Sequence, residues 1–165
     1  MAFTIDDRVV HPQHGVGRVI KLESRRFGAG TAQLYYEIAL AKGTIWVPVV
    51  NHPGGLRPLT GKDELPRYRG LLRSRPAPLA ADHRQRQLEV SERLKQGTFR
   101  ARCEVVRDLT AHGWQKPLCQ SSAALLRMAV DALDEEWAAV EGLPVSDATR
   151  QVQALLLECK QAFAH

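Results

Sequence analysis

The chain has 165 residues, of which 44% are hydrophobic and 25% charged, so its composition fits a soluble globular protein of one ordinary domain or two small ones. No apolar run is long enough to span a bilayer, and residues 1–7 lack the features of a signal peptide, so we expect a cytoplasmic protein. Cys103, Cys119 and Cys159 are odd in number and widely spaced, which favours buried free thiols over disulfides.

The net charge of +5 is distributed unevenly along the chain. Residues 1–62 hold 8 Lys/Arg and 4 Asp/Glu, which gives +4, and residues 63–116 hold 12 and 7, which gives +5. Residues 117–165 hold 3 and 7, which gives −4. A basic front and middle favour a polyanionic partner for these two regions. The alternative from charge alone is an ordinary solvated surface of mixed charge.

Residues 1–58 have the pattern of a β domain. The apolar pair Val9 and Val10 leads into a His-Pro-Gln-His-Gly turn at residues 11–15, and a second strand-like run follows at once. Residues 33–40 alternate as a half-buried strand does. The side chains expected on its inner face are Leu34, Tyr36, Ile38 and Leu40.

Residues 44–49 form another β-rich run. Pro48 cannot donate to a hydrogen-bonded ladder, so we expect it at a sheet edge or a strand end. Residues 51–55 read as a loop, and residues 56–59 are expected to close the domain. Four or five short strands in fewer than 60 residues predict a small, strongly bent β-barrel. Barrels of this size bind other molecules far more often than they catalyse.

From residue 63 the apolar period becomes helical, and about five helices are expected. Asp82 with Gln85 three residues later resembles a capping box, and Gly97 is expected to end that helix. These helices pack together as a second domain, so the predicted fold is α+β with domains at 1–60 and 61–165. The expected helix starts are Glu64, Asp82, Thr98, Ser121 or Ser122, and Ser146.

No group of residues predicts catalysis or metal binding. The acidic run 134–136 is expected on a solvated helix face. His11 and His14 lie in a turn without a cysteine or carboxylate at metal-ligand spacing. His112 and Cys119 are too isolated to form a thiol nucleophile with its base. We therefore expect a protein that is not an enzyme and that needs no cofactor or metal.

Basic side chains give the stronger signal. Guanidinium groups match phosphate oxygens with forked donors, and each neutralised phosphate releases counterions. Nothing in the sequence arranges side chains to read base edges, so recognition of shape or backbone is expected. The basic residues in this region are Arg67, Arg69, Arg73, Arg75, Arg84, Arg86, Arg93, Lys95, Arg100 and Arg102.

Three stretches resemble one protein family. Residues 9–17, Val-Val-His-Pro-Gln-His-Gly-Val-Gly, look like the "VV-P-HG-G" opening of the CarD/CdnL transcription regulators, whose N-terminal domain resembles that of the transcription-repair coupling factor. The positions that fit the end of that domain are Val47, Pro48, Asn51, Gly55, Leu56 and Arg57. In the helical half, Gly97 and the run 104–109 match the family's "G…EVVRDL" stretch.

The resemblance implies a bacterial RNA polymerase-binding protein. In the family a Tudor-like barrel, here residues 1–60, adds its exposed edge strand to the polymerase β subunit, which is β-augmentation. Trp46 is expected to be exposed at that interface, and the alternative is an aromatic in the barrel core. The implied polymerase-binding residues are Glu23, Arg25, Arg26, Thr44, Ile45, Trp46 and Val47.

The resemblance also implies that the helical domain, residues 61–165, contacts upstream promoter DNA. In the family a tryptophan wedges into the minor groove, and counting back from Gly97 puts His83 at its position. An imidazole covers far less area than an indole. Trp114 is a remote candidate to compensate, with a core or cap role as the alternative. The implied DNA-binding residues are His83, Arg84, Arg86, Arg93, Lys95 and Arg100.

The resemblance thus implies a regulator that binds the polymerase β subunit and promoter DNA and stabilises the open promoter complex. The alternative is an adaptor that binds polymerase through the barrel without wedging into DNA, because His83 replaces the usual tryptophan. Neither interpretation includes a membrane or a small-molecule substrate.

Overall fold

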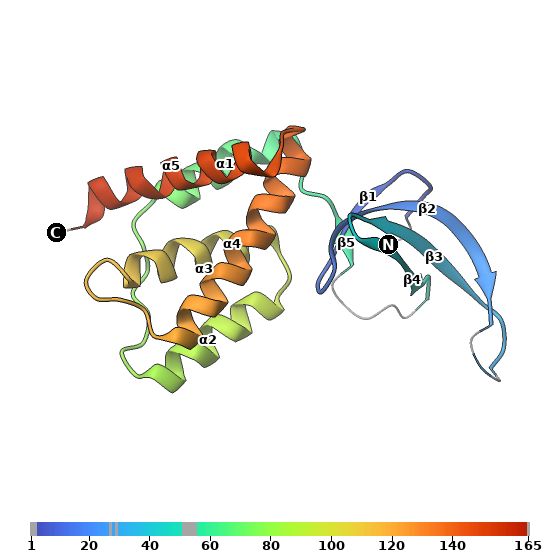
Figure 1. Cartoon of the computed structure of the whole chain (residues 1–165), viewed down its shortest axis with the longest axis horizontal. Helices are drawn as coiled ribbons and strands as arrows, with labels where there is room; N and C mark the ends of the chain where they lie inside the picture. Colours follow the sequence, from blue (N-terminus) through green and yellow to red (C-terminus); the bar gives the residue numbers. More distant parts are fainter. Residues whose placement is uncertain (1–2, 27, 29, 51–55, 165) are drawn as a thin grey trace. The chain divides into compact units, whose positions relative to one another are not determined.

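The computed structural model describes residues 3–26, 28, 30–50 and 56–164. The chain divides into two compact units, Met1–Leu59 and Thr60–His165, here called the strand unit and the helical unit. Within the described residues five strands precede five α-helices, which confirms the α+β class (Figure 1). No described helix combines the length and apolar character that a membrane span needs.

The strand unit is one antiparallel sheet in the order β4-β3-β2-β1-β5. Gly15 has φ +80° where β1 turns into β2, a backbone conformation that glycine adopts without a steric penalty. The sheet is a meander from β1 to β4, so each of these strands pairs with the next along the chain. The strands are β1 Arg8–His11, β2 Gly15–Arg25, β3 Gln33–Leu40, β4 Gly43–Pro48 and β5 Arg57–Pro58.

The closure expected for a barrel is not found in the part of the chain that is described. β5 pairs with β1, with Val9 opposite Pro58 and Val10 opposite Arg57, so it lengthens the sheet at the β1 side. β4 and β5 are therefore the two ends of the sheet and are not hydrogen-bonded neighbours. The loop predicted at residues 51–55 lies outside the described residues.

One face of this sheet forms the core of the strand unit. A Cβ added at Gly17 would lie 2.5 Å from Ile38 Cγ2, so there is no room for a side chain at this position and glycine fits it. Leu34, expected on the inner face, is half exposed because it lies at the end of the region where β3 pairs with β4. The buried side chains of this core are Phe3, Val9, Val19, Tyr36, Ile38, Val47 and Leu56.

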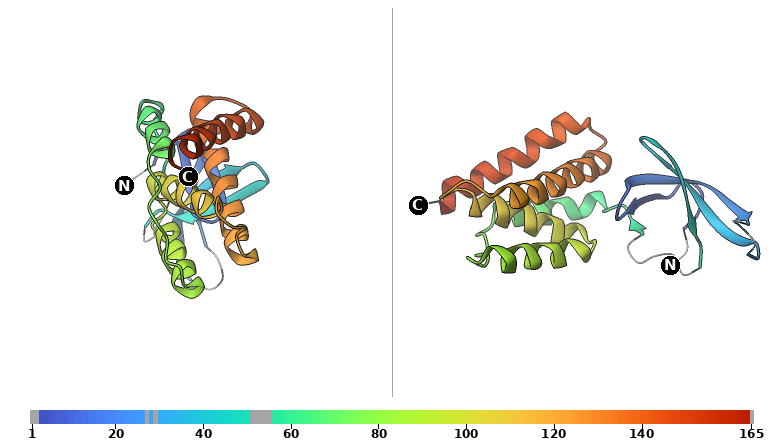
Figure 2. Two further views of the ribbon diagram at one scale, coloured as in Figure 1. Left: turned by 90° about the vertical axis from the view of Figure 1, so that its left-hand side faces the viewer. Right: turned by 60° about the horizontal axis from the view of Figure 1, so that its bottom comes forward.

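The helical unit packs around α3. Figure 1 shows α3 with α2 on one side and α1 and α5 on the other, and Figure 2 shows the same packing from two further sides. Trp137 is fully buried, and its ring centroid lies 6.2 Å from that of Phe99. The elements are η1 Lys62–Glu64, α1 Leu65–Arg73, α2 His83–Lys95, α3 Phe99–His112, α4 Gln120–Glu141 and α5 Val145–Phe163.

Two of the expected helix caps are confirmed. The Asp82 carboxylate accepts from the Gln85 amide at 2.9 Å, and the Thr98 hydroxyl accepts from the Ala101 amide at 3.0 Å. The expected starts of the last two helices are wrong by one or two residues. Cys119 is the N-cap of α4 and Pro144 is that of α5, because each of these residues has extended backbone just before the helix.

The solvated position expected for the acidic run is wrong at two of its three residues. Asp134 is 3% exposed and Glu136 is fully buried, because α4 packs against both α3 and α5. Glu136 Oε2 accepts from the Thr60 hydroxyl at 2.6 Å and from the Thr60 amide at 3.2 Å, and Arg102 Nη1 lies 3.3 Å from Oε1. The buried carboxylate therefore anchors the first residue of the helical unit.

Candidate interaction surfaces

β4 forms a free edge of the sheet within the described residues, as Pro48 at its end predicts. Trp46 is 37% exposed whereas Val47 is 4% exposed, since alternate side chains of a strand point to opposite faces. The Arg25 guanidinium carbon lies 4.6 Å from the centroid of the Trp46 ring. Trp46 is therefore not a core aromatic, and its indole is held under a cation at the surface.

A shallow hollow of about 510 Å³ lies beside this edge. The β1–β2 turn supplies His11 and His14 to it, and β4 supplies most of the rest. The sequence predicts only that both histidines lie in the turn. Their position beside β4 arises from the folded sheet, so the sequence carries no signal for it. The residues that line the hollow are His11, His14, Tyr35, Thr44, Ile45, Trp46 and Val47.

The two histidines form a compact pair in the hollow. Their ring centroids are 4.8 Å apart, and His11 Nδ1 accepts from the amides of Gln13 at 3.1 Å and His14 at 3.2 Å. Burial, followed by the neighbouring His14, lowers the pKa of His11. His11 therefore presents a neutral imidazole to the hollow at pH 7.

The remaining polymerase-binding candidates lie near the end of β2. Glu23 stands opposite Tyr35 in the sheet register, and its carboxylate lies 3.5 Å from Arg25 Nε. Arg26 is exposed and follows the last residue of β2. The structure thus brings Arg25 and Trp46 into contact, although they are 21 positions apart in the chain, and leaves Arg26 just beyond the strand.

Four of the DNA-binding candidates are exposed side chains on α2 and α3. His83 and Arg84 are the first two residues of α2, and Lys95 is its last. Arg100 lies in the first turn of α3. A 13-residue helix is about 20 Å long, so His83 and Arg84 at the start of α2 lie far from Lys95 at its end. Lys95 and Arg100 also face acidic neighbours, Glu92 at 3.5 Å and Glu104 at 3.8 Å.

The other two DNA-binding candidates turn inward. Arg86 is 8% exposed, and its Nη1 donates to the carbonyls of Ala80 and Ala81, each at 3.1 Å. Arg93 Nη1 donates to Asp108 Oδ2 at 2.9 Å, with about a third of the Arg93 side chain exposed. Arg86 therefore holds the segment before α2 in place and does not present its guanidinium to solvent.

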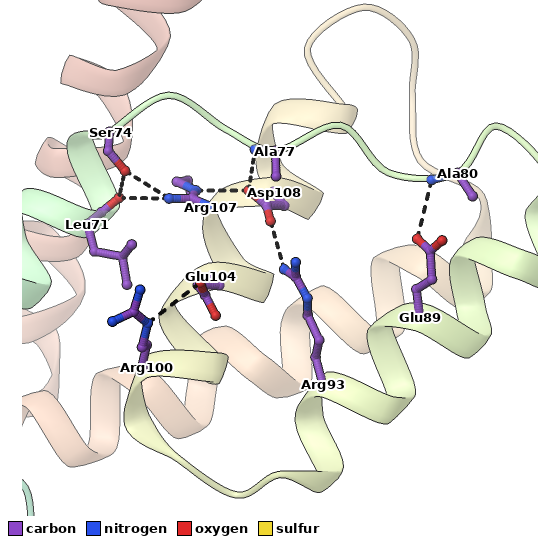
Figure 3. Close-up of polar contacts among 10 residues, drawn as sticks. All are labelled: Leu71, Ser74, Ala77, Ala80, Glu89, Arg93, Arg100, Glu104, Arg107 and Asp108. Atoms are coloured by element: carbon purple, nitrogen blue, oxygen red, sulfur yellow. Dashed lines mark hydrogen bonds and ion pairs between the residues drawn. The ribbon is translucent and has the colours of Figure 1, made fainter.

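Asp108 gathers several elements of the helical unit around one buried carboxylate (Figure 3). Its Oδ1 accepts from Arg107 Nε at 2.8 Å and from the Ala77 amide at 3.0 Å. Arg107 Nη1 in turn donates to the Ser74 hydroxyl at 2.8 Å, at the end of α1. The Arg-Asp pair of the "EVVRDL" stretch thus joins α3 to α1, to α2 through Arg93, and to the connection between α1 and α2.

Cys119 has a histidine neighbour that the sequence does not indicate. Its Sγ lies 3.4 Å from Nδ1 of His83, which is 36 positions away in the chain. The expectation that Cys119 is isolated is therefore wrong. The sequence carries no signal for this contact, because it arises only when α2 and the start of α4 pack together.

Comparison with known proteins identifies the family. Residues 3–60 match the CarD-like/TRCF RID domain, and residues 69–153 match the CarD C-terminal domain. These matches define a class of two-domain proteins in which a CarD-like/TRCF RID domain precedes a CarD C-terminal domain. The chain belongs to the CarD family.

A relative from Bacillus subtilis (strain 168) bears the name "Putative transcription factor YdeB". It is 25% identical over 143 residues, which cover 86% of this chain and 94% of the relative. Together with the family matches, this likeness supports a role in transcription regulation.

The Asp108 cluster generates a stability prediction. We expect Asp108→Ala to lower the free energy of unfolding by about 3–5 kcal/mol, because it leaves the Arg107 guanidinium buried without its anionic partner. Urea unfolding followed by far-ultraviolet circular dichroism measures the change. Glu92→Ala is the control, since Glu92 forms an exposed ion pair worth at most about 1 kcal/mol. Equal losses in both variants would contradict the role given to Asp108.

Proposed function

We propose that this protein is a transcription regulator that binds the RNA polymerase β subunit through β4 and upstream promoter DNA through the helical unit. In this role it stabilises the open promoter complex. The observation that carries the proposal is the free edge of β4, with the exposed Trp46 indole under Arg25 and a hollow alongside.

The edge of β4 suits β-augmentation. A strand added to a sheet edge gains affinity from backbone hydrogen bonds, and pockets beside the edge select its side chains. Trp46 offers a large apolar surface with one polar atom, the type of residue that dominates binding energy at interfaces. The hollow lined by His11, His14 and Thr44 is placed to receive a side chain of the added strand.

The contact with DNA rests on exposed cations rather than on base readout. Arg84, Lys95 and Arg100 present their charged groups to solvent, and such groups bind phosphates without selecting sequence. A weak contact of this kind becomes effective when polymerase holds the protein near the promoter, because binding is then intramolecular. The basic balance of residues 63–116 supports this arrangement.

The surroundings of His83 favour a second candidate, an adaptor that binds polymerase without wedging into DNA. The His83 ring nitrogens lie 3.4 Å from Cys119 Sγ and 3.4 Å from Ser121 Oγ, so the imidazole is occupied by its own helical unit. An imidazole held in this way offers little area for insertion between base pairs.

The polymerase contact is tested with Trp46→Ala. We expect affinity for a polymerase β fragment to fall by about tenfold or more, because truncating a central aromatic commonly costs about 2 kcal/mol. A binding titration with the full chain measures the effect. Met128→Ala removes an apolar side chain that is 65% exposed on α4 and should leave the affinity unchanged. If Trp46→Ala binds as tightly as the wild type, β4 is not the polymerase contact.

The DNA contact is tested by reversing the charge of Arg84. We expect Arg84→Glu to weaken DNA binding and to reduce the slope of log affinity against log salt by about 1, with polymerase binding unchanged. Arg150→Glu makes the same charge change on α5, where the side chain is 74% exposed, and should have little effect. If Arg84→Glu weakens DNA binding and polymerase binding equally, the proposal that the helical unit binds DNA and the strand unit binds polymerase is contradicted.

Substitutions of His83 distinguish the two candidate functions, the regulator and the adaptor. For a regulator that engages the minor groove, His83→Trp should lengthen the lifetime of the open complex, since an indole covers more area than an imidazole. His83→Ala should shorten it. The lifetime is measured by challenging preformed complexes with a competitor. If neither variant changes the lifetime, position 83 takes no part in the mechanism and the adaptor is favoured.

A further inference from the structure

Cys119 is an exposed cysteine at the centre of a polar cluster. Its thiol donates to the hydroxyl oxygen of Ser122 at 3.3 Å, and its Sγ lies 3.6 Å from the hydroxyl oxygen of Ser121; both serines are on the first turn of α4. His83, from the start of α2, brings Nδ1 to 3.4 Å from the same sulfur atom. The cluster therefore joins a nucleophile to an imidazole base across two helices.

The cluster stabilises the ionised form of the thiol. The Ser122 hydroxyl is the main cause that lowers the pKa of Cys119 to about 6, because it can rotate to donate to the sulfur once the thiol ionises; the Ser122 amide and the Ser121 hydroxyl follow. Cys119 is also the N-cap of a 22-residue helix, whose unpaired amides favour a negative charge at this end. These groups therefore favour the thiolate form of Cys119 over the thiol.

A buried arginine points to the same place. Arg86 is 8% exposed, and its Nε has no hydrogen-bond partner within the described residues. Its Nη2 lies 3.5 Å from His83 Nδ1, the nitrogen that faces Cys119. A guanidinium can only donate, so Arg86 and the Cys119 thiol compete for the one lone pair of Nδ1, while the positive charge of Arg86 favours the thiolate.

The other two cysteines differ from Cys119 in burial and in the direction of their pKa shifts. Cys103 and Cys159 are buried, and burial raises the pKa of both thiols. Cys159 Sγ also donates to the Ser74 carbonyl at 3.2 Å. Reactivity towards reagents in solution should therefore belong to Cys119.

We propose that Cys119, with His83 as its neighbouring base, is a modification site that reacts with low-molecular-weight disulfides. In this step the Cys119 proton passes to His83 Nδ1 and then to solvent. The thiolate attacks one sulfur of the small disulfide, the disulfide bond breaks, and a mixed disulfide forms on Cys119. The second sulfur leaves as a thiolate, so the reaction needs no further oxidant. This site does not depend on polymerase or DNA binding.

The test measures the rate at which the full chain reacts with dithiobis-nitrobenzoic acid, an aromatic disulfide, with mass spectrometry to locate the label. At pH 6, Cys119 should react about tenfold faster than the free tripeptide glutathione, because its larger thiolate fraction outweighs its lower intrinsic nucleophilicity. The rate should rise with pH around a midpoint near 6. Cys119→Ser should abolish the fast reaction.

Variants of the cluster identify its causes. Ser122→Ala should raise the midpoint of the pH–rate profile. Ser122→Ala and His83→Ala, each as a single variant, should slow the reaction at pH 6 several-fold. Arg127→Gln removes an exposed cation further along α4 and should leave the rate unchanged. The proposal is overturned if the wild-type midpoint is near 9, or if the label is found on Cys103 or Cys159. The wild-type profile alone decides if a variant does not fold.

Discussion

The helical unit depends on one buried carboxylate. Asp108 is almost completely buried, and removing a carboxylate from water costs several kcal/mol unless its oxygens are paired. Arg107, Arg93 and the Ala77 amide supply those partners from α3, α2 and the α1–α2 connection. The position of α2, and with it that of Arg84 and His83, follows from this pairing. The "EVVRDL" stretch is thus a structural signature, and the helix that it positions carries residues of the proposed DNA contact.

The two units offer a partner different kinds of interaction. The strand unit presents the backbone groups of β4 and the indole of Trp46, whose contributions depend on shape and register. The helical unit presents charges, whose contributions depend on salt and tolerate small shifts in position. Cys119 lies in the helical unit, so its modification would alter the neighbourhood of His83 and leave β4 untouched.

Local features of this fold could be predicted from the sequence, and distant contacts could not. Asp82 and Thr98 cap helices through residues three positions away, so their roles are visible in the sequence itself. The burial of Glu136 depends on Thr60, 76 positions away, and the environment of Cys119 depends on His83. The burial of Arg86 could not be predicted for the same reason, because the carbonyls of Ala80 and Ala81, and not its residue type, direct its guanidinium inward.

The edge of β4 that is free within the described residues is also open to a second copy of the chain. Any extended segment can pair with an unpaired edge, and antiparallel pairing of β4 with itself would join two sheets into one and promote aggregation. Lys42 and Pro48 lie on either side of the edge and oppose such pairing. Lysine resists burial between two sheets, and proline removes a donor. Both residues therefore limit pairing of β4 with a second copy of the chain.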